Sequence, residues 1–305
     1  MSPASGILLV DKPGGITSHD VVARTRRAFG TRKIGHAGTL DPMATGLLVL
    51  GIEGATRLLT YLVGLDKTYE TTIRLGAATT TDDAEGETVS TAAAGALGSV
   101  TDSRIADRVA RLTGRISQVP STFSAIKVDG RRAYDLARAG QDVELKAREV
   151  TISRFALGES RRAALADGTE VIDLDATIDC SSGTYIRALG RDLGADLGVG
   201  GHLTMLRRTR IGPFEIADAH TLDALADGAP ALLDPAEVAS RVLGRLDVTA
   251  EEARDLRHGK KLAGQAGRLE GDLAAAVDPE GVLVGVVERR GEALKSAMNM
   301  PEVTA

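Results

Sequence analysis

The segment GHAGTLDPMATG, residues 35–46, constrains the fold of this 305-residue chain more than any other stretch. Three glycines, one proline, one histidine and one carboxylate stand within twelve residues, with little apolar material for ordinary packing. We therefore expect a constrained loop that presents Asp41 as its only carboxylate. An aspartate before a proline is most often a turn residue or a helix cap, so residue type alone leaves its role open.

The elements next to this segment are expected to be short. An apolar run at residues 7–10 predicts a strand that ends in a turn at residues 12–15. Ser18 is expected to cap a helix that ends at Gly30 and turns its arginines outward. Residues 31–46 are predicted to form one long loop, residues 47–52 a buried strand, and residues 55–63 a short helix.

The rest of the chain predicts an α/β (α+β) fold with a mixed, largely antiparallel sheet. Several strands are joined by turns and not by regular helix crossovers, which favours antiparallel pairing. The predicted strands are residues 67–75, 124–128 and 171–180, and the predicted helices are residues 103–112, 131–139 and 186–197.

The stretch of residues 221–242, rich in Ala, Asp, Leu and Pro, predicts a domain boundary. Beyond it, residues 273–277 and 282–288 read as a hairpin that turns at residues 278–281. A small β-rich C-terminal appendage is therefore expected.

Composition excludes several classes of protein. Cys180 is the only cysteine, which rules out an intrachain disulfide and a multi-cysteine zinc site, and it is expected to be a buried structural thiol. The sequence has no apolar run long enough for a transmembrane helix and no secretory signal, so we expect a cytoplasmic protein. Walker A, GxGxxG and HExxH motifs are absent, so neither a cofactor nor a metal is expected.

The acidic run at residues 82–87 lacks the ligand spacing of a metal site. It contains Asp82, Asp83, Glu85 and Glu87. We expect it to form a solvated acidic turn.

The distribution of charge leaves two interpretations open. The net charge of −5 argues mildly against a nucleic-acid-binding protein, but the basic residues are segregated along the chain. They are either solvated faces or phosphate-binding surfaces. The three basic groups are Lys12, Arg24, Arg26, Arg27, Arg32 and Lys33; Lys127, Arg131, Arg132 and Arg138; and Arg207, Arg208 and Arg210.

Residues 35–46 closely resemble the G-H-x-G-x-L-D-P-x-A-x-G signature of the bacterial tRNA pseudouridine-55 synthases, the TruB family. Asp41 occupies the invariant aspartate of that family. Other family motifs follow in order: DKPGGITS at residues 11–18, KTY at residues 67–69, SGTYIR at residues 182–187, and GHLTMLRR at residues 201–208. The resemblance runs from about residue 6 to about residue 220, and the C-terminal segment looks like the PUA-type RNA-binding domain of these enzymes.

The resemblance implies a role for five residues around the uracil. Asp41 would be the nucleophile, and Arg187 would pair with it and favour its ionised form. Tyr69 would stack on the uracil and take part in proton loss from C5. Tyr185 would contact the substrate, and Leu206 would form an apolar wall. Each has a plainer alternative: a surface arginine, a half-buried strand tyrosine, a core leucine. Whether Asp41 attacks C1′, adds to C6 of the uracil, or assists glycal formation stays open.

The resemblance also implies how the RNA is held. A T-loop uridine must be flipped out of its stack, and His36 would insert near the vacated position; the alternative is a loop histidine bonded to backbone. An insertion at about residues 121–149 would close on the T-arm. The expected phosphate contacts are Lys12, Arg24, Arg27, Arg32, Lys127, Arg131, Arg132 and Arg138.

The sequence therefore predicts a tRNA pseudouridine synthase with a catalytic domain at residues 1–240 and a PUA-like domain at residues 245–305. We expect tRNA as its partner, a monomer, no membrane association and no obligatory protein partner. Three alternatives remain: a synthase acting on another RNA, a tRNA-binding folding factor with incidental catalysis, and an unrelated soluble α/β protein.

Overall fold

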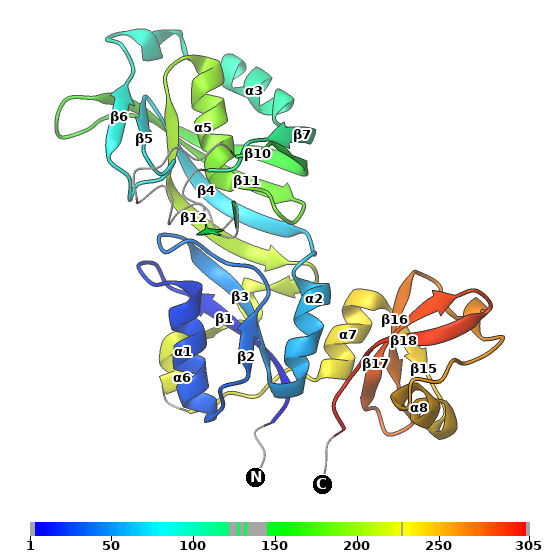
Figure 1. Cartoon of the computed structure of the whole chain (residues 1–305). Coiled ribbons are helices and arrows are strands. Elements are labelled where there is room, and N and C mark those ends of the chain that lie inside the picture. The colour runs from blue at the N-terminus through cyan, green and yellow to red at the C-terminus, as the bar shows by residue number, and fades with distance from the viewer. Residues whose placement is uncertain (1–3, 122–126, 129–130, 133–144, 227, 303–305) are drawn as a thin grey trace. The chain divides into compact units, whose positions relative to one another are not determined.

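The computed structural model describes residues 4–121, 127–128, 131–132, 145–226 and 228–302 (Figure 1). The chain divides into two compact units. Unit 1 comprises Met1–Pro42, Gly46–Val63 and Ile211–Ala305, and unit 2 comprises Met43–Thr45 and Gly64–Arg210.

The first half of unit 1 is a small sheet with helices packed against it. β1 pairs antiparallel with β3 and parallel with β14, and β2 adds to the other side of the β3 segment. Apolar residues of β1, β3 and α1 form one core with Leu222 and Leu225 of α6. The elements are β1 (Gly6–Lys12), α1 (Ser18–Phe29), β2 (Ile34–His36), β3 (Thr45–Ile52), η1 (Glu53–Leu58), α2 (Leu59–Leu62), β13 (Phe214–Glu215), η3 (Ile216–Asp218), β14 (His220–Thr221) and α6 (Leu222–Ala226).

The predicted cap of α1 is wrong by one residue. Thr17 is the N-cap and forms a capping box with Asp20, because its hydroxyl accepts the Asp20 backbone N–H. Ser18 instead donates its hydroxyl to the Leu40 carbonyl (3.1 Å) and accepts the Leu40 N–H (2.9 Å). The predicted end at Gly30, which adopts a left-handed conformation at φ 63°, is confirmed.

Two other predictions in this region need correction. Residues 31–46 are not one loop, because Ile34–His36 form β2 against β3, with Ile34 opposite Ile52. The predicted helix at 55–63 is a 3-10 helix, η1, followed by the short helix α2. Pairing with a distant strand and packing against the core determine the structure of these two segments. Local sequence propensity does not contain this information.

The second half of unit 1 is a four-stranded sheet in the order β15-β16-β17-β18. The predicted hairpin is confirmed, and the Asp278 carboxylate holds its turn by accepting the N–H groups of Glu280 and Val282. The core of this sheet also continues through α7 to Leu58. The elements are α7 (Pro235–Leu243), β15 (Arg245–Asp247), α8 (Ala250–Arg257), η4 (Ala266–Arg268), β16 (Leu273–Val277), β17 (Leu283–Arg290) and β18 (Ala293–Asn299). The predicted boundary near residues 240–245 stays a prediction.

Unit 2 is built on strands in the order β12-β4-β11-β10-β7, with α3 and α5 packed against each other. The pairs β4–β11, β11–β10 and β10–β7 are antiparallel, so the predicted sheet type is confirmed. The strand at 67–75 and the helix at 186–197 are confirmed at their predicted bounds. The elements are β4 (Lys67–Leu75), β5 (Ala77–Thr79), β6 (Thr88–Thr91), η2 (Ala96–Ser99), α3 (Asp102–Arg111), β7 (Gly114–Gln118), β10 (Arg148–Ala164), β11 (Glu170–Cys180), α5 (Ile186–Leu197) and β12 (Gly201–Ile211).

Strand alternation in unit 2 separates an apolar face from a polar one. On β4, Ile73 and Leu75 are buried, whereas Thr72 and Arg74 lie on the half-buried face. There Arg74 forms a two-bond ion pair with Asp173 of β11, at 2.7 Å for each bond.

None of the described helices is long and apolar enough to cross a membrane.

The predicted insertion at 121–149 is only partly described. β8 (Lys127–Val128) pairs antiparallel with β9 (Arg131–Arg132), so the predicted helix is wrong at its first two residues. The sequence Asp129-Gly130 between the strands is a strong hairpin signal, which outweighs the helical pattern. Arg138 lies outside the described residues.

Candidate active site

The loop that carries Asp41 is anchored on both sides within unit 1. Before Asp41 in the chain, the Ala37 N–H donates to the Val49 carbonyl at 2.9 Å. After Asp41, the Pro42 carbonyl accepts the Gly15 N–H at 2.9 Å and Lys12 Nζ at 3.2 Å. The half-buried Asp41 carboxylate therefore stands on a backbone with little freedom to move.

Lys12 supports this loop from inside the protein. Its side chain is fully buried, and Nζ donates to the carbonyls of Pro13 (2.9 Å), Ile16 (2.8 Å) and Pro42. The structure contradicts the prediction of Lys12 as a phosphate contact, because an ammonium enclosed by backbone carbonyls is not presented to RNA. Burial of a lysine in this way is compatible with its charge only because donors and acceptors are matched.

Replacing Lys12 by methionine should cost stability and turnover without changing the salt dependence of tRNA binding. The substitution removes the three hydrogen bonds that Nζ donates, although the Pro42 carbonyl keeps the Gly15 N–H, and we expect a loss of about 2 kcal/mol in unfolding free energy. The matched control is Arg27→Ala, at an exposed position. This substitution should reduce the salt slope, which is the slope of the logarithm of the binding constant against the logarithm of the salt concentration, by about one phosphate contact. Denaturant unfolding and binding titrations from low to high salt would measure both; a reduced salt slope for Lys12→Met would restore the phosphate-contact role.

The other predicted RNA contacts of unit 1 lie at its surface. Arg24, Arg27 and Arg32 are exposed, as phosphate contacts must be, and their role stays a prediction. His36 is half-buried, and its ring meets that of His19 edge to face, with centroids 5.5 Å apart. The predicted insertion of His36 into the RNA also stays a prediction.

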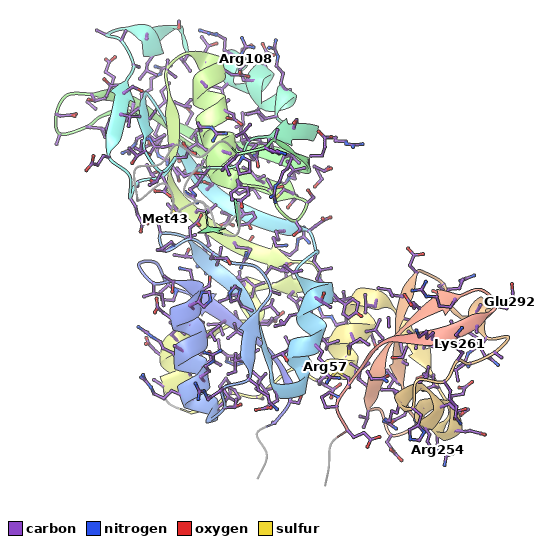
Figure 2. All side chains as sticks on the ribbon, viewed as in Figure 1. Met43, Arg57, Arg108, Arg254, Lys261 and Glu292 are labelled. Atoms are coloured by element: carbon purple, nitrogen blue, oxygen red, sulfur yellow. The ribbon has the colours of Figure 1, made fainter. Side chains whose placement is uncertain are left out.

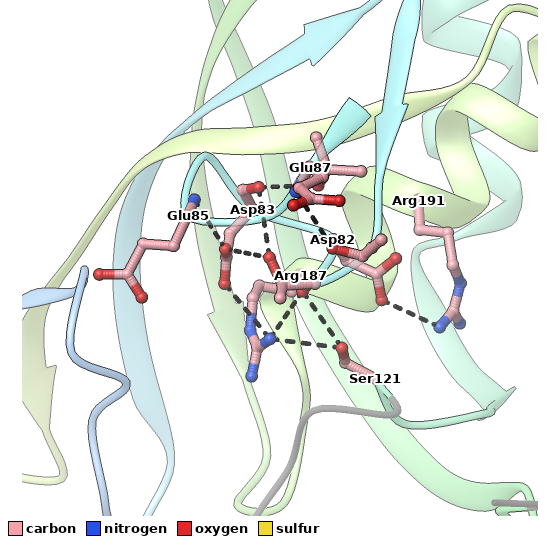
Figure 3. A network of polar contacts seen from close by, with 10 residues as sticks. Asp82, Asp83, Glu85, Glu87, Ser121, Arg187 and Arg191 are labelled. Carbon is pink, nitrogen blue, oxygen red and sulfur yellow. Dashed lines mark hydrogen bonds and ion pairs between the residues drawn. The ribbon is translucent and has the colours of Figure 1, made fainter. Parts of the chain in front are cut away.

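In unit 2, Arg187 lies in the first turn of α5 and is buried, with 3% exposure. One terminal nitrogen, Nη1, donates to the Thr81 carbonyl (2.7 Å) and Ser121 Oγ (3.3 Å), and lies 3.3 Å from Asp83 Oδ2 (Figure 3). The alternative of a surface arginine is therefore excluded. Its predicted pairing with Asp41 stays a prediction.

The acidic run is not a solvated turn at its first two positions. Asp83 is 3% exposed; besides Arg187, its carboxylate accepts the Thr81 hydroxyl and the Glu85 N–H. Asp82, at φ 60°, pairs with Arg191 at 3.3 Å, and burial raises the pKa of its carboxyl although Arg191 opposes this.

The arginines explain why these acids are buried. Arg187 and Arg191 stand four residues apart on α5, so both reach the loop between β5 and β6, as Figure 3 shows. The sequence signal that could have predicted this pairing is the combination of two adjacent aspartates with two arginines spaced i, i+4. Glu85 and Glu87 are exposed as predicted. Among the described residues, no group of His, Cys, Asp and Glu is arranged to hold a metal.

Tyr69, Tyr185 and Leu206 come from three elements of unit 2. Tyr69 is 7% exposed on β4, and Leu206 is 6% exposed on β12. Tyr185 is the N-cap of α5, and the amide of buried Gln118 holds its backbone, accepting its N–H (2.8 Å) and donating to its carbonyl (3.1 Å). Gln118, like Asp83, is a supporting residue that the sequence did not suggest.

The third basic group is not an exposed patch. Arg208 of β12 is 1% exposed, and Arg207 and Arg210 are half-buried.

Burial and, next, the Arg208 guanidinium lower the pKa of Lys67 to about 8. The prediction that Cys180 is buried is confirmed; it lies opposite Lys67 on β11, and burial raises the pKa of its thiol to about 11.

Comparison with known proteins gives consistent matches along the chain. Residues 26–186 match the TruB family pseudouridylate synthase (N terminal domain), residues 187–239 the tRNA pseudouridylate synthase B C-terminal domain, and residues 243–301 tRNA Pseudouridine synthase II, C terminal. The tRNA pseudouridine synthase B of Leifsonia xyli is 57% identical over 97% of both chains. That of Nocardia farcinica is 54% identical over 96% of this chain and 92% of its own.

Solved structures show a likeness of fold. An H/ACA RNP bound to a substrate RNA containing 2′-deoxyuridine matches with a TM-score of 0.70 at 24% identity, over 97% of this chain and 85% of that chain. A Cbf5-Nop10-Gar1 complex matches with a TM-score of 0.67 at 23% identity, over 97% of this chain and 84% of that chain.

Proposed function

The chain belongs to the TruB family of tRNA pseudouridine synthases, and we propose that it isomerises a flipped-out T-loop uridine with Asp41 as the nucleophile. The observation that carries the assignment of Asp41 is its anchored loop. Lys12, Gly15 and Ser18 fix the backbone around a single carboxylate, which is what a positioned nucleophile requires.

The reaction needs little beyond this carboxylate and its surroundings. It breaks the C1′–N1 bond, rotates the uracil and forms a C5–C1′ bond, and a proton leaves C5 while N1 gains one. Atoms and electrons balance within the nucleoside itself. Asp41 serves by attack on C1′, by addition to C6 or by assisting glycal formation, and each route starts from its ionised form.

Arg187, Tyr69, Tyr185 and Leu206 are proposed to act on the same uridine. Arg187 provides the positive charge that favours an ionised Asp41, and its own position depends on Asp83. Tyr69 stacks on the uracil and takes part in proton loss from C5, and Leu206 contributes apolar surface.

Affinity for tRNA is proposed to come from exposed cations and not from the catalytic residues. His36 supports the opened T-loop, Arg24, Arg27 and Arg32 contact phosphates, and the insertion with Lys127, Arg131 and Arg132 closes on the T-arm. The PUA-like C-terminal segment adds cations such as Arg254 and Lys261, which project from it in Figure 2. We propose a cytoplasmic monomer without an obligatory protein partner.

Pseudouridine mapping of an unmodified tRNA transcript tests this function. The purified protein, with nothing added, should introduce one pseudouridine into the T-loop. A transcript whose T-loop uridine is replaced by cytidine should acquire none. Modification of a different RNA in a total-RNA reaction, with the tRNA left unchanged, would overturn the T-loop assignment and favour a synthase with another substrate.

A further inference from the structure

His202 is a buried histidine of the GHLTMLRR motif, and it has no role in the proposed mechanism. It is the second residue of β12 and is 6% exposed. Its Nδ1 lies 2.9 Å from the backbone carbonyl of Ala77, the first residue of β5. A carbonyl oxygen only accepts hydrogen bonds, so Nδ1 must carry the proton of this bond.

This bond is one of three hydrogen bonds that join the start of β12 to the β5–β6 hairpin, whose turn carries the acidic run. The Gly76 N–H donates to the Gly200 carbonyl at 3.1 Å, and the Leu203 N–H donates to the Asp82 carbonyl at 3.0 Å. With the His202–Ala77 bond between them, these contacts hold the beginning and the turn of the β5–β6 hairpin. The turn is the segment that carries Asp83, the carboxylate partner of Arg187.

Residues 200–203, which lead into and begin β12, also set the position of α5, which carries Arg187. A Cβ on Gly194 would lie 2.2 Å from the Gly200 carbonyl carbon, so helix and strand approach at a distance that only glycine permits. A Cβ on Gly190 would lie 2.8 Å from a methyl of Leu203. The segments that carry Arg187 and Asp83 are therefore both held in place by one short stretch, residues 200–203.

We propose that His202 is a positioning residue for the Arg187 guanidinium, acting by the Nδ1–H bond that holds the Asp83 hairpin to β12. This inference rests on the proposed function of Arg187. Without the bond, the buried Ala77 carbonyl loses its donor and the hairpin loses its middle attachment. A displacement of about 1 Å in a supporting group is enough to lower turnover by about 100-fold.

Two variants whose side chains branch alike at Cγ separate the hydrogen bond from packing. His202→Leu removes the donor, whereas His202→Asn places an amide N–H at the position of Nδ1. We expect kcat for pseudouridine formation to fall about 10- to 100-fold in His202→Leu and to stay within about threefold of wild type in His202→Asn. KM and tRNA affinity should change little in either.

A double-mutant cycle with Asp83→Asn identifies the route of the effect. If His202 acts through Asp83, His202→Leu should add little to the loss caused by Asp83→Asn alone. Val150→Ala is the control for a general loss of packing, because Val150 is buried in the same unit but pairs with Ile116 of β7, away from the hairpin. It should lower the melting temperature with little effect on kcat.

Equal losses in His202→Leu and His202→Asn, wild-type turnover in His202→Leu, or additive losses in the cycle would overturn the proposal. Nitrogen-15 NMR of the wild-type imidazole adds a test that needs no folded leucine variant, with His202→Asn used only for assignment. A neutral ring protonated at Nε2 alone would also overturn it. Absence of pseudouridine formation by the wild-type protein would instead refute the proposed function, and the NMR result would still report on the contact.

Discussion

Asp41→Asn should form no detectable pseudouridine in tRNA while binding that tRNA within about tenfold of wild-type affinity. The amide keeps the shape of the side chain but lacks the ionised carboxylate from which each of the three routes starts, so turnover is lost. The anchors of the loop are a lysine, a serine hydroxyl and backbone groups, which the substitution leaves in place. Affinity is retained because exposed cations and not the carboxylate hold the phosphates.

Pseudouridine mapping after long incubation, together with a filter-binding titration, measures both halves of this prediction. Glu53→Gln is a matched control, since it also neutralises a half-buried carboxylate of unit 1, one that bonds Thr31 and Lys33 away from the loop. It should leave turnover within a few fold of wild type. Turnover by Asp41→Asn near the wild-type rate would remove Asp41 from the mechanism.

Asp83→Asn should lower turnover by about 100-fold and also destabilise the protein. Both side chains of the Arg187–Asp83 pair are only 4% exposed, so the substitution removes a countercharge from a buried guanidinium. Removing one partner of such a pair typically costs about 3–5 kcal/mol, part of which the Thr81 and Ser121 contacts of Arg187 offset. The remaining displacement of Arg187 is expected to appear as a loss in kcat and not in tRNA affinity.

Asp82→Asn is the natural control for this effect, because it changes the neighbouring carboxylate in the same loop. Its partner Arg191 is 29% exposed, and pairs that solvent reaches contribute about 1 kcal/mol or less. Asparagine also tolerates the left-handed backbone at this position. Single-turnover kinetics and thermal melts of the two variants should therefore differ clearly; equal losses would mean that the loop as a whole, and not the Arg187–Asp83 pair, sets turnover.

The parts of the fold that the sequence predicted well are those with a local pattern. Strict alternation located the strand at residues 67–75, and helical periodicity followed by Gly198 located the helix at residues 186–197. Turn residues between two apolar runs located the hairpin around Asp278. Two of the predictions that were wrong, a single loop at residues 31–46 and a helix starting at Arg131, concern segments that pair with another strand.

The candidate site divides in the same way. Its family and its proposed nucleophile are indicated by the order of short motifs, above all residues 35–46, because a constrained loop needs particular residues at particular positions. The burial of Lys12, the pairing of Asp83 with Arg187 and the bond from His202 to Ala77 were decided only by the tertiary structure. Arg187 and Thr81 are 106 residues apart in the chain, and His202 and Ala77 are 125 apart. A charged side chain is a phosphate contact, a solvated group or a buried support according to what packs around it, and chain folding brings those neighbours from segments that no local pattern connects.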